Sequence, residues 1–347
     1  MIQTNLYPLL CTSVAFVLSL WLTGWFRSYA LRAGLLDVPN ARSSHVGPTP
    51  RGGGVAIVVA VQAMLPALAI VGEVEWRTVL GLMTSGLIAA AIGYADDRAQ
   101  VGLPVRLGAQ FAAAACIVGF LGFAPVISVF GLSASFAWIA AVFTLLYLVW
   151  MLNLTNFMDG IDGLASAETI SISVGTVVCV VAVAVKGTDN SVAAAVSIAT
   201  LLAAATAGFL YWNWAPAKIF MGDAGSGFVG ISLGALALVA GYVDSTLLWS
   251  SVILAGVFIV DATVTLFRRI ARREKFYNAH RSHAYQHAAQ RWGHTRVTTA
   301  VIMINVFWLL PWAVAAAQGS LYGAVACVLA YSPLVAAALR FRAGVAD

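Results

Sequence analysis

The sequence predicts an all-α fold, a polytopic integral membrane bundle of about 10–11 transmembrane helices. Three observations predict this class. Of the 347 residues, 61% are hydrophobic. Only 10% are charged, against about a quarter in an ordinary soluble domain. Uncharged runs such as residues 1–26, 107–158 and 297–339 contain more apolar length than one soluble core could bury. We therefore expect one membrane domain over residues 1–347.

The individual spans follow from a length of about 20 residues each, broken at glycine, proline and charged clusters. The run 107–158 is too long for one helix, so the turn formers around residues 119–135 must divide it, and residues 318–320 divide the last apolar stretch in the same way. The expected spans are residues 5–26, 53–72, 78–95, 105–122, 134–152, 164–185, 191–212, 226–243, 246–267, 297–316 and 320–339.

The basic residues predict the orientation of this bundle. With the N-terminus outside and the C-terminus cytoplasmic, the inner loops and the C-terminal end hold 17 of the 19 Lys and Arg residues, and only Arg77 and Lys186 lie outside. Such an excess on one side is typical of cytoplasmic loops. Because topology explains the cations, the net charge of +5 gives little reason to expect a nucleic-acid partner.

Five carboxylates from three separate loops are expected at the cytoplasmic face. A single acid at a helix end is usually just interfacial and solvated, but paired acids repel each other unless a cation or a proton offsets their charge. Carboxylate oxygens are also the ligands that Mg²⁺ takes while it keeps waters and substrate phosphates. We therefore expect a cation site at this face. The five acids are Asp96, Asp97, Asp159, Asp162 and Asp223.

Glycines accompany these acids. Glycine lets a backbone approach a ligand closely, and the start of the eighth span, near Ser226, could present free N–H groups to a phosphate. In the first inner loop, Arg51 precedes three glycines. That loop is either an ordinary polar connector or a phosphate contact. Glycine is also common in membrane helices for packing, so the glycines alone are weak evidence.

The last inner loop, residues 268–296, contains four of the five histidines. On a helix, His280, His283 and His287 would share one face because they are spaced by three and four residues. The alternatives are a generic basic helix at the interface and a site for an anionic ligand or a sugar. Asp261, inside the ninth span, is expected to support the site or to form a structural ion pair, and the same alternatives apply to Glu168.

Four motifs in this order resemble the polyprenyl-phosphate N-acetylhexosamine-1-phosphate transferase superfamily, glycosyltransferase family 4. They are the paired Asp at 96–97, the loop "NLTNFMDGIDGLA" at 153–165, the loop "FMGDAGSGFVG" at 220–230 and the late histidine-rich loop. The stretches "PNARSSHVGPTPRGGG" and "HRSHAYQ" are most similar to the branch that initiates O-antigen and related polysaccharides.

The resemblance implies a reaction. An N-acetylhexosamine-1-phosphate would pass from a UDP-N-acetyl-sugar donor to undecaprenyl phosphate, with release of UMP, at the cytoplasmic face of a bacterial inner membrane. Because two polyanions must meet at one phosphorus, Mg²⁺ (or Mn²⁺) would neutralise charge, with Asn156 and Asp223 as its ligands. We also expect the lipid bilayer as a partner. A homodimer is a further hypothesis.

The resemblance also implies roles for individual side chains. Asp96 and Asp97 would lie by the acceptor phosphate, and Asp159 and Asp162 complete the expected catalytic set. The expected substrate-binding residues are Arg51, Arg106, Asn153, Phe220, Asp261, His280 and His283. Among them, Phe220 would stack on uracil and the two histidines would contact the donor. Two positions depart from the family pattern: Ser282 replaces a frequent histidine, and Arg106 replaces a frequent lysine.

Two other classes of protein fit part of this pattern. A cation-coupled secondary transporter also needs acids within a helical bundle, but carriers hold their sites near the bilayer midplane, often in repeated halves. Here the acids are expected at one face, and no internal repeat is evident. A polyprenyl diphosphate phosphatase is disfavoured by the several acidic loops with an aromatic residue beside one of them.

Overall fold

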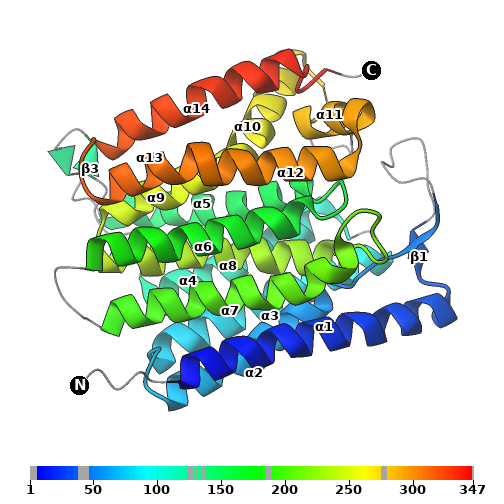
Figure 1. Cartoon of the computed structure of the whole chain (residues 1–347), viewed down its shortest axis with the longest axis horizontal. Helices are drawn as coiled ribbons and strands as arrows, with labels where there is room; N and C mark the ends of the chain where they lie inside the picture. Colours follow the sequence, from blue (N-terminus) through cyan, green and yellow to red (C-terminus); the bar gives the residue numbers. More distant parts are fainter. Residues whose placement is uncertain are drawn as a thin grey trace.

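A computed structural model describes residues 6–37, 47–99, 101–122, 128–129, 132–133, 137–184, 190–274 and 280–345. Within these ranges the protein is a bundle of long helices that run alongside one another (Figure 1). The helices are α1 (Tyr7–Ala33), α2 (Val55–Ile70), α3 (Trp76–Ala99), α4 (Leu103–Leu121), α5 (Ala137–Met158), α6 (Leu164–Ala184), α7 (Asn190–Asn213), α8 (Asp223–Val243), α9 (Thr246–Leu254), α10 (Gly256–Ala271), α11 (Ala284–Trp292), α12 (His294–Ile304), the π-helix η1 (Asn305–Leu309), α13 (Leu310–Ala317) and α14 (Gly323–Arg340). Arg42, His45 and Lys186, which belong to the loops considered above, lie outside the described residues.

The helices confirm the expected all-α class and the multi-pass architecture. In the described part of the chain, nine helices are long and apolar enough to cross a membrane, or ten if α9 and α10, which meet at a bend of 70°, form one broken span. The expected second span corresponds to α2, which is apolar but has only 16 residues. The expected tenth span corresponds to α12, η1 and α13 in sequence.

Two details differ from the expectation. The first helix runs seven residues past the expected end and stops at Gly34, which has a positive φ of 67°. Two short antiparallel ladders were not expected, β1 (Leu36–Asp37) with β2 (Thr49–Pro50), and β3 (Ser128–Val129) with β4 (Leu132–Ser133). Strands of two residues give no alternating pattern that a sequence could reveal.

The centre of the bundle is α8. Over its most apolar window, 83% of the residues are buried inside the protein, whereas the outer helices α1 and α14 have 22% and 17%. The glycines and alanines of α8 suit this central position, because small residues allow neighbouring backbones to approach closely. A Cβ at Gly230 would lie 2.7 Å from the Cα of Leu152 on α5. The first residue of α8, Asp223, is thereby placed in the middle of one end of the bundle.

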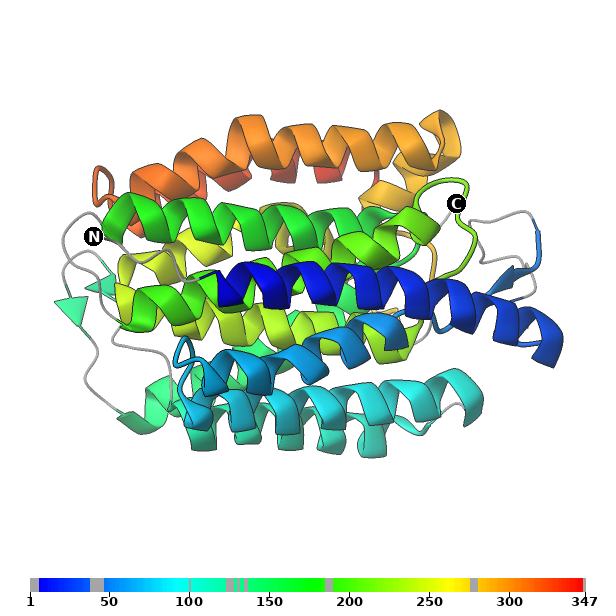
Figure 2. The ribbon, with the colours of Figure 1, turned by 60° about the horizontal axis from the view of Figure 1, so that its bottom comes forward.

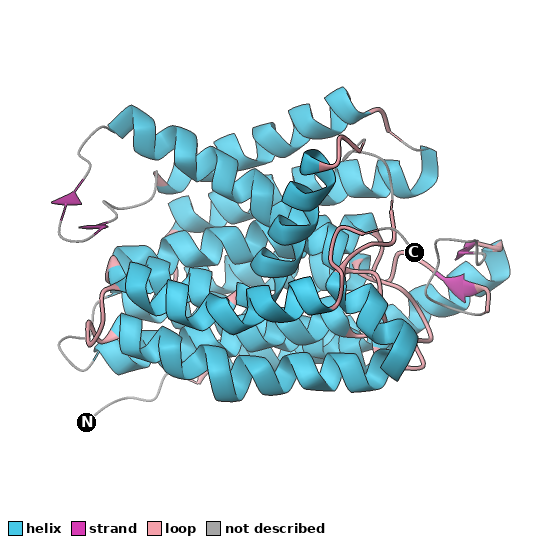
Figure 3. Cartoon of the chain, turned by 90° about the horizontal axis from the view of Figure 1, so that it is seen from above, coloured by secondary structure: helices cyan, strands magenta, loops and turns pink. Residues whose placement is uncertain are grey.

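Most of the described loops gather at that same end (Figure 3). Figures 1 and 2 show α1 beginning at the opposite end and α14 finishing at the end with the loops. The loops 159–163 and 214–222, the β1–β2 ladder and α11 therefore form one polar face. This face is where the acidic motifs meet.

Candidate active site

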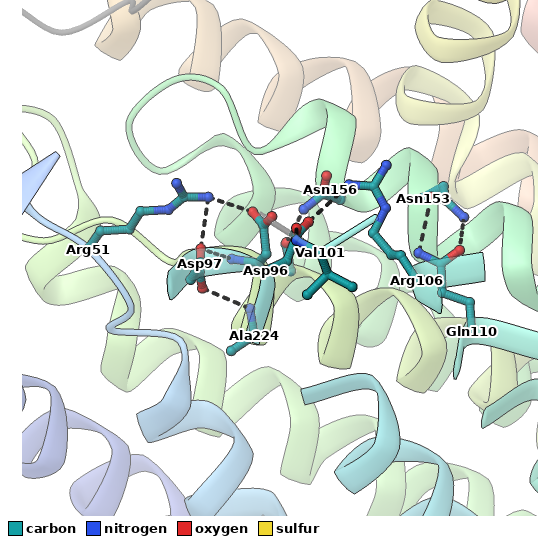
Figure 4. Close-up of polar contacts among 11 residues, drawn as sticks. Arg51, Asp96, Asp97, Val101, Arg106, Gln110, Asn153, Asn156 and Ala224 are labelled. Carbon is teal, nitrogen blue, oxygen red and sulfur yellow. Dashed lines mark hydrogen bonds and ion pairs between the residues drawn. The ribbon is translucent and has the colours of Figure 1, made fainter. Parts of the chain in front are cut away.

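One arginine joins two of the predicted acids. The Nη2 of Arg51 lies 2.8 Å from Oδ1 of Asp97, in the last turn of α3, and 2.6 Å from Oδ1 of Asp223, the first residue of α8 (Figure 4). The side chain of Asp97 is only 10% exposed and that of Asp223 25%. Three segments far apart in the sequence thus meet in one partly buried ion-pair cluster.

Asp97 also caps the start of α8. Its Oδ1 accepts the backbone N–H of Asp223 at 3.1 Å, and its Oδ2 accepts that of Ala224 at 3.3 Å. A carboxylate is favourable there because the first N–H groups of a helix lack partners and carry partial positive charge. The N–H groups of Gly225 and Ser226 are donated to the carbonyl of Gly222 at 3.1 and 3.0 Å, so the expectation that the start of this helix offers free N–H groups to a phosphate is wrong.

The three glycines after Arg51 allow the backbone there to lie close to the backbone of the loop 214–222. Gly52 and Gly53 donate their N–H groups to the carbonyl of Phe220 at 3.1 and 2.9 Å, and Gly54 donates to the carbonyl of Met221 at 2.9 Å. A Cβ at Gly54 would lie 2.5 Å from the Cα of Gly225. Here the absence of a side chain is a steric requirement, and the pairing fixes Arg51 beside the loop that leads to Asp223.

A second ion pair lies next to the first. Asp96 accepts a hydrogen bond from Nη1 of Arg106 at 2.9 Å and another from the backbone N–H of Val101 at 2.7 Å (Figure 4). Asn153, one of the expected substrate-binding residues, exchanges amide hydrogen bonds of 2.8 and 3.2 Å with Gln110 on α4. Gln110 was not predicted as a site residue from the sequence, where the only indication is that it lies one turn after Arg106 on the same helix.

The space between these groups is small. The cavity lined by Asp96, Arg106, Asn153, Asn156 and Asp223 has a volume of about 20 Å³, enough for one water-sized group. A larger cavity of about 680 Å³ lies near the opposite end of the bundle, between the α2–α3 loop and the start of α7, and it contains none of the predicted site residues. The predicted site residues Asp96, Arg106, Asn153, Asn156 and Asp223 therefore line the smaller of these two cavities.

The two acids of the loop 159–163 have different surroundings. Burial raises the pKa of Asp159 well above its usual range, the Arg51 guanidinium lowers it, and the carboxylates of Asp223 and Asp97 raise it further. A cation beside these acids would relieve that repulsion. Asp159, Asp97 and Asp223, three of the five acids expected at this face, therefore influence one another electrostatically.

Asp162 instead holds the neighbouring loops. Its Oδ2 accepts the N–H of Ala217 at 3.0 Å, its Oδ1 lies 3.2 Å from Nδ1 of His294, and its carbonyl accepts the hydroxyl of Thr298 at 3.0 Å. These contacts tie loop 159–163 to loop 214–222 and to α12. We interpret Asp162 as a positioning residue, since its carboxylate already has protein partners.

Asp261 fixes the start of α11. It accepts the backbone N–H groups of Ala284 at 3.0 Å and Tyr285 at 2.9 Å, and it lies 3.2 Å from Nδ1 of His283, the residue before the helix. The hydroxyl of Thr265 also donates to it at 3.1 Å. Asp261 is only 5% exposed. The geometry favours the supporting role over direct substrate contact.

The histidines do not share a helix face, so that expectation is wrong. Helix α11 begins at Ala284, with His280 in the irregular segment before it and His283 at the N-cap. Their rings nevertheless stack at 5.0 Å between centroids. His287 points elsewhere: its Nε2 lies 3.2 Å from the carbonyl oxygen of Val345 near the C-terminal end.

The environment of His280 keeps its ring neutral. Burial lowers its pKa to about 3, with further lowering by His283 and the cation of Arg269. Its Nδ1 lies 3.0 Å from the hydroxyl of Ser282. A neutral imidazole can donate or accept a hydrogen bond, so His280 suits a sugar or a diphosphate oxygen as a polar partner rather than as a countercharge.

Tyr285 is a functional-site residue that the sequence analysis missed. Its hydroxyl donates to the carbonyl of Phe157 at 2.9 Å, and a Cβ added at Gly160 would overlap that hydroxyl. Gly160 is therefore needed so that α11 can lie against loop 159–163. The same kind of contact explains Gly93, one turn before Asp97, whose Cβ would overlap the backbone of Asp223.

The donor atoms fit Mg²⁺ better than a softer metal. In the described ranges, no group of three or more His, Cys, Asp or Glu side chains is arranged as a metal cage. Mg²⁺, however, is usually bound by one or two carboxylates together with waters and substrate phosphates. Asn156 donates its amide N–H to the hydroxyl of Ser226 at 3.0 Å, and its side chain lines the same cavity as Asp223, so its amide oxygen could serve as a metal ligand there.

The chain is similar to known enzymes. Residues 79–241 match glycosyl transferase family 4. The "probable undecaprenyl-phosphate N-acetylglucosaminyl 1-phosphate transferase" of Bacillus subtilis is 32% identical over 280 residues, which cover 78% of this chain and 75% of that protein. The "decaprenyl-phosphate N-acetylglucosaminephosphotransferase" of Mycolicibacterium smegmatis is 33% identical over 240 residues, 65% of this chain and 58% of that protein. The "phospho-N-acetylmuramoyl-pentapeptide-transferase" of Kocuria rhizophila is 29% identical over 337 residues, 83% of this chain and 86% of that protein.

Proposed function

This chain belongs to glycosyl transferase family 4, and from that premise we propose that it transfers an N-acetylhexosamine-1-phosphate from a UDP-sugar to undecaprenyl phosphate, with release of UMP. The product is the lipid-linked sugar on which a cell-surface glycan is started. The names of the Bacillus and Mycolicibacterium relatives favour N-acetylglucosamine as the sugar. The observation that carries the proposal is the convergence of Arg51, Asp97 and Asp223 from three segments at one end of a membrane bundle.

The two arginines suit the binding of phosphate. Arg51 and Arg106 each hold a carboxylate within 2.9 Å, and a guanidinium fork matches a phosphate as well as it matches a carboxylate. When a phosphate group enters, each arginine can exchange its carboxylate for a phosphate oxygen. Asp97 or Asp96 then keeps its backbone hydrogen bonds but loses its arginine partner, so its remaining lone pairs can orient the acceptor phosphate or accept its proton.

Asp223 and the amide oxygen of Asn156 would hold the Mg²⁺ ion, with Mn²⁺ as a substitute. The ion would supply charge neutralisation for the donor diphosphate. A cation held there would also favour the charged form of Asp159, because the carboxylates of Asp223 and Asp97 raise the pKa of Asp159 and the cation would offset their charge. This protein's contribution is to keep the carboxylates together before the substrates arrive.

The donor would lie between Phe220 and the two stacked histidines. Phe220 is carried by the loop paired with Arg51, and His283 stacks on Phe157 at 6.4 Å as well as on His280. In this arrangement Phe220 faces the uracil, and the histidines contact the diphosphate or the sugar. Asp261 and Asp162 position these segments.

We further propose that this end of the bundle is cytoplasmic, in a bacterial inner membrane, with the N-terminus outside. The asymmetry of Lys and Arg between the two ends supports this orientation. A homodimer stays a hypothesis, which the mass of the detergent-solubilised particle would test.

Purified protein incubated with UDP-[¹⁴C]N-acetylglucosamine, undecaprenyl phosphate and Mg²⁺ tests the function. We expect label in the lipid phase and one UMP for each labelled lipid. A panel of other UDP-N-acetyl-sugars defines the donor. Uptake of a solute into vesicles without lipid labelling would instead identify the cation-coupled transporter, and release of phosphate from a lipid diphosphate would identify the phosphatase.

A further inference from the structure

Two cations share one tryptophan at the surface between α1 and α7. The guanidinium carbon of Arg27 lies 5.9 Å from the ring of Trp212, and the Nζ of Lys218 lies 5.4 Å from the same ring and 5.5 Å from that of Tyr211. The indole itself is fixed, because its N–H donates to the carbonyl of Leu20 at 2.9 Å. The ring is thus held in place with both positive charges within 5.9 Å of it.

No carboxylate in the described part of the chain forms an ion pair with either cation. The Nε of Arg27 is buried and has no hydrogen-bond partner among the described residues. Like charges close together are unfavourable unless an anion offsets them. The lack of a carboxylate partner distinguishes Arg27 and Lys218 from Arg51 and Arg106, each of which forms an ion pair with at least one acid.

The surroundings of the two cations point to a lipid. Trp25, Tyr29 and Tyr211 expose 54%, 41% and 63% of their surface on α1 and α7, and aromatic side chains of this kind mark the membrane–water interface. Basic pockets between membrane helices bind anionic head groups. A lipid whose phosphate lies between Arg27 and Lys218 could extend its chains along these exposed aromatic residues.

We propose that Arg27, Lys218 and Trp212 form a binding site for the head-group phosphate of an anionic phospholipid such as phosphatidylglycerol. The site is separate from the Arg51–Asp97–Asp223 cluster. It touches the same loop, however, because Lys218 closes that loop by donating its backbone N–H to the carbonyl of Trp212 at 2.8 Å. The bound lipid would therefore hold α1 against the segment that leads to Phe220.

The competing explanation is that both cations merely add to the positive charge of this membrane face. A charge-matched control separates the two explanations. Native mass spectrometry of the purified full chain would measure phosphatidylglycerol binding for the wild type, for Arg27→Gln/Lys218→Gln, and for Arg32→Gln/Arg340→Gln. Arg32 and Arg340 are exposed at the ends of α1 and α14 and away from Trp212.

We expect the first double variant to bind phosphatidylglycerol roughly 30-fold more weakly, since two cations at an anionic head group are removed, and the control to change less than about twofold. Equal losses in both variants would show diffuse attraction and overturn the proposal. So would equally tight binding of phosphatidylcholine to the wild type. The single variant Lys218→Glu, at an exposed position, should also lose binding and provides a test if the double variant does not fold.

Competition on the wild type identifies the source of the phosphate. We expect millimolar inorganic phosphate to leave phosphatidylglycerol bound, because a free anion has no chains to place along the exposed aromatic residues. Displacement by inorganic phosphate would mean a site for free anions. Displacement by an equimolar amount of undecaprenyl phosphate would assign the site to the acceptor. Either result would refute the phospholipid assignment.

Discussion

A single guanidinium group, that of Arg51, balances two carboxylates in this protein. Asp97 and Asp223 would otherwise repel each other at the start of α8, where Asp97 already accepts two backbone N–H groups. The two acids consequently have different tasks. Asp97 accepts a backbone N–H group of the helix through each of its oxygens, whereas Asp223 is more exposed and therefore suits the proposed role of metal ligand.

Replacement of Asp223 by asparagine tests that division. Asparagine keeps the volume but removes the negative charge, so we expect the variant to fold and to lose transfer activity by roughly 100-fold or more, because a metal contributes several kcal/mol to such a transition state. The measurement is the initial rate of lipid labelling by purified enzyme at saturating Mg²⁺. The melting temperature in detergent serves as the control for folding. Substantial activity in a folded variant would remove Asp223 from the metal site.

Removal of the metal should have a matching effect. Treatment with EDTA should abolish lipid labelling, and Mg²⁺ or Mn²⁺ should restore it, since both ions accept octahedral oxygen ligands. Binding of Mn²⁺, followed by electron paramagnetic resonance in the absence of substrates, should be weaker in Asp223→Asn than in the wild type. Unchanged activity in a metal-free sample would mean that the carboxylates neutralise something other than a metal.

The sequence reveals which residues carry chemistry here better than it reveals their partners. Acids at the ends of three apolar spans predict the cluster because charge in that position is costly. The long-range partners of Asp261 and Asp162 could not be predicted, because backbone N–H groups occur at every residue and leave no mark in the sequence. The tight contact of Gly54 with Gly225 is invisible for a similar reason: a glycine shows that space is limited without showing which segment limits it.

Helix α11 is attached to the rest of the site by a few polar contacts. Asp261 holds its first turn, and Tyr285 joins it to α5 and to Gly160. The histidine spacing suggested a longer helix than α11, because the pattern shows which residues would share a face but not where a helix starts. The start is set by the buried carboxylate of Asp261, far from α11 in sequence.

The contact between Gly160 and Tyr285 can be tested by a double-mutant cycle. Gly160→Ala places a methyl group against the Tyr285 hydroxyl, so we expect a loss of about 1–3 kcal/mol in stability, typical of overpacking, and weaker donor binding. Tyr285→Phe alone should have a smaller effect. The combination should recover much of the loss, since the clashing oxygen is gone, and thermal unfolding in detergent measures each step. Strictly additive losses would show that the two positions do not interact.

The histidines at the start of α11 predict a difference between the two substrates. Replacing His280 or His283 with alanine should raise the KM for UDP-sugar and leave that for undecaprenyl phosphate nearly unchanged, because the prenyl chain must come from the bilayer and the nucleotide from the water phase. Arg291→Ala, an exposed change on the same helix, is the control. A selective rise in the KM of the acceptor would contradict the donor assignment.

The whole bundle was the most predictable feature, because a membrane requires apolar segments of fixed length. Each expected span overlaps a helix or a group of helices, but in the described part of the chain only nine helices, or ten with α9 and α10 as one broken span, are long and apolar enough to cross a membrane. The departures have local causes. The bend of 70° between α9 and α10 lies at Ala255, next to Gly256. A Cβ at that glycine would lie 2.8 Å from the ring of Tyr331. Hydropathy averaged over a span cannot detect such a contact.

The orientation of the bundle gives the last prediction. If the end with Arg51 and α11 is cytoplasmic, a cysteine at position 75, in the α2–α3 turn, should react with a membrane-impermeant maleimide in intact spheroplasts. A cysteine at position 296, at the start of α12, should react only after the membrane is opened. Glu75→Cys and Arg296→Cys both replace exposed side chains, and a background without the four native cysteines removes other thiols. The asymmetry of 17 inner against two outer cations is the physical reason for this expectation. The reverse labelling pattern would invert the bundle and place the acidic cluster outside, where the nucleotide-sugar donor of the proposed reaction would not reach it.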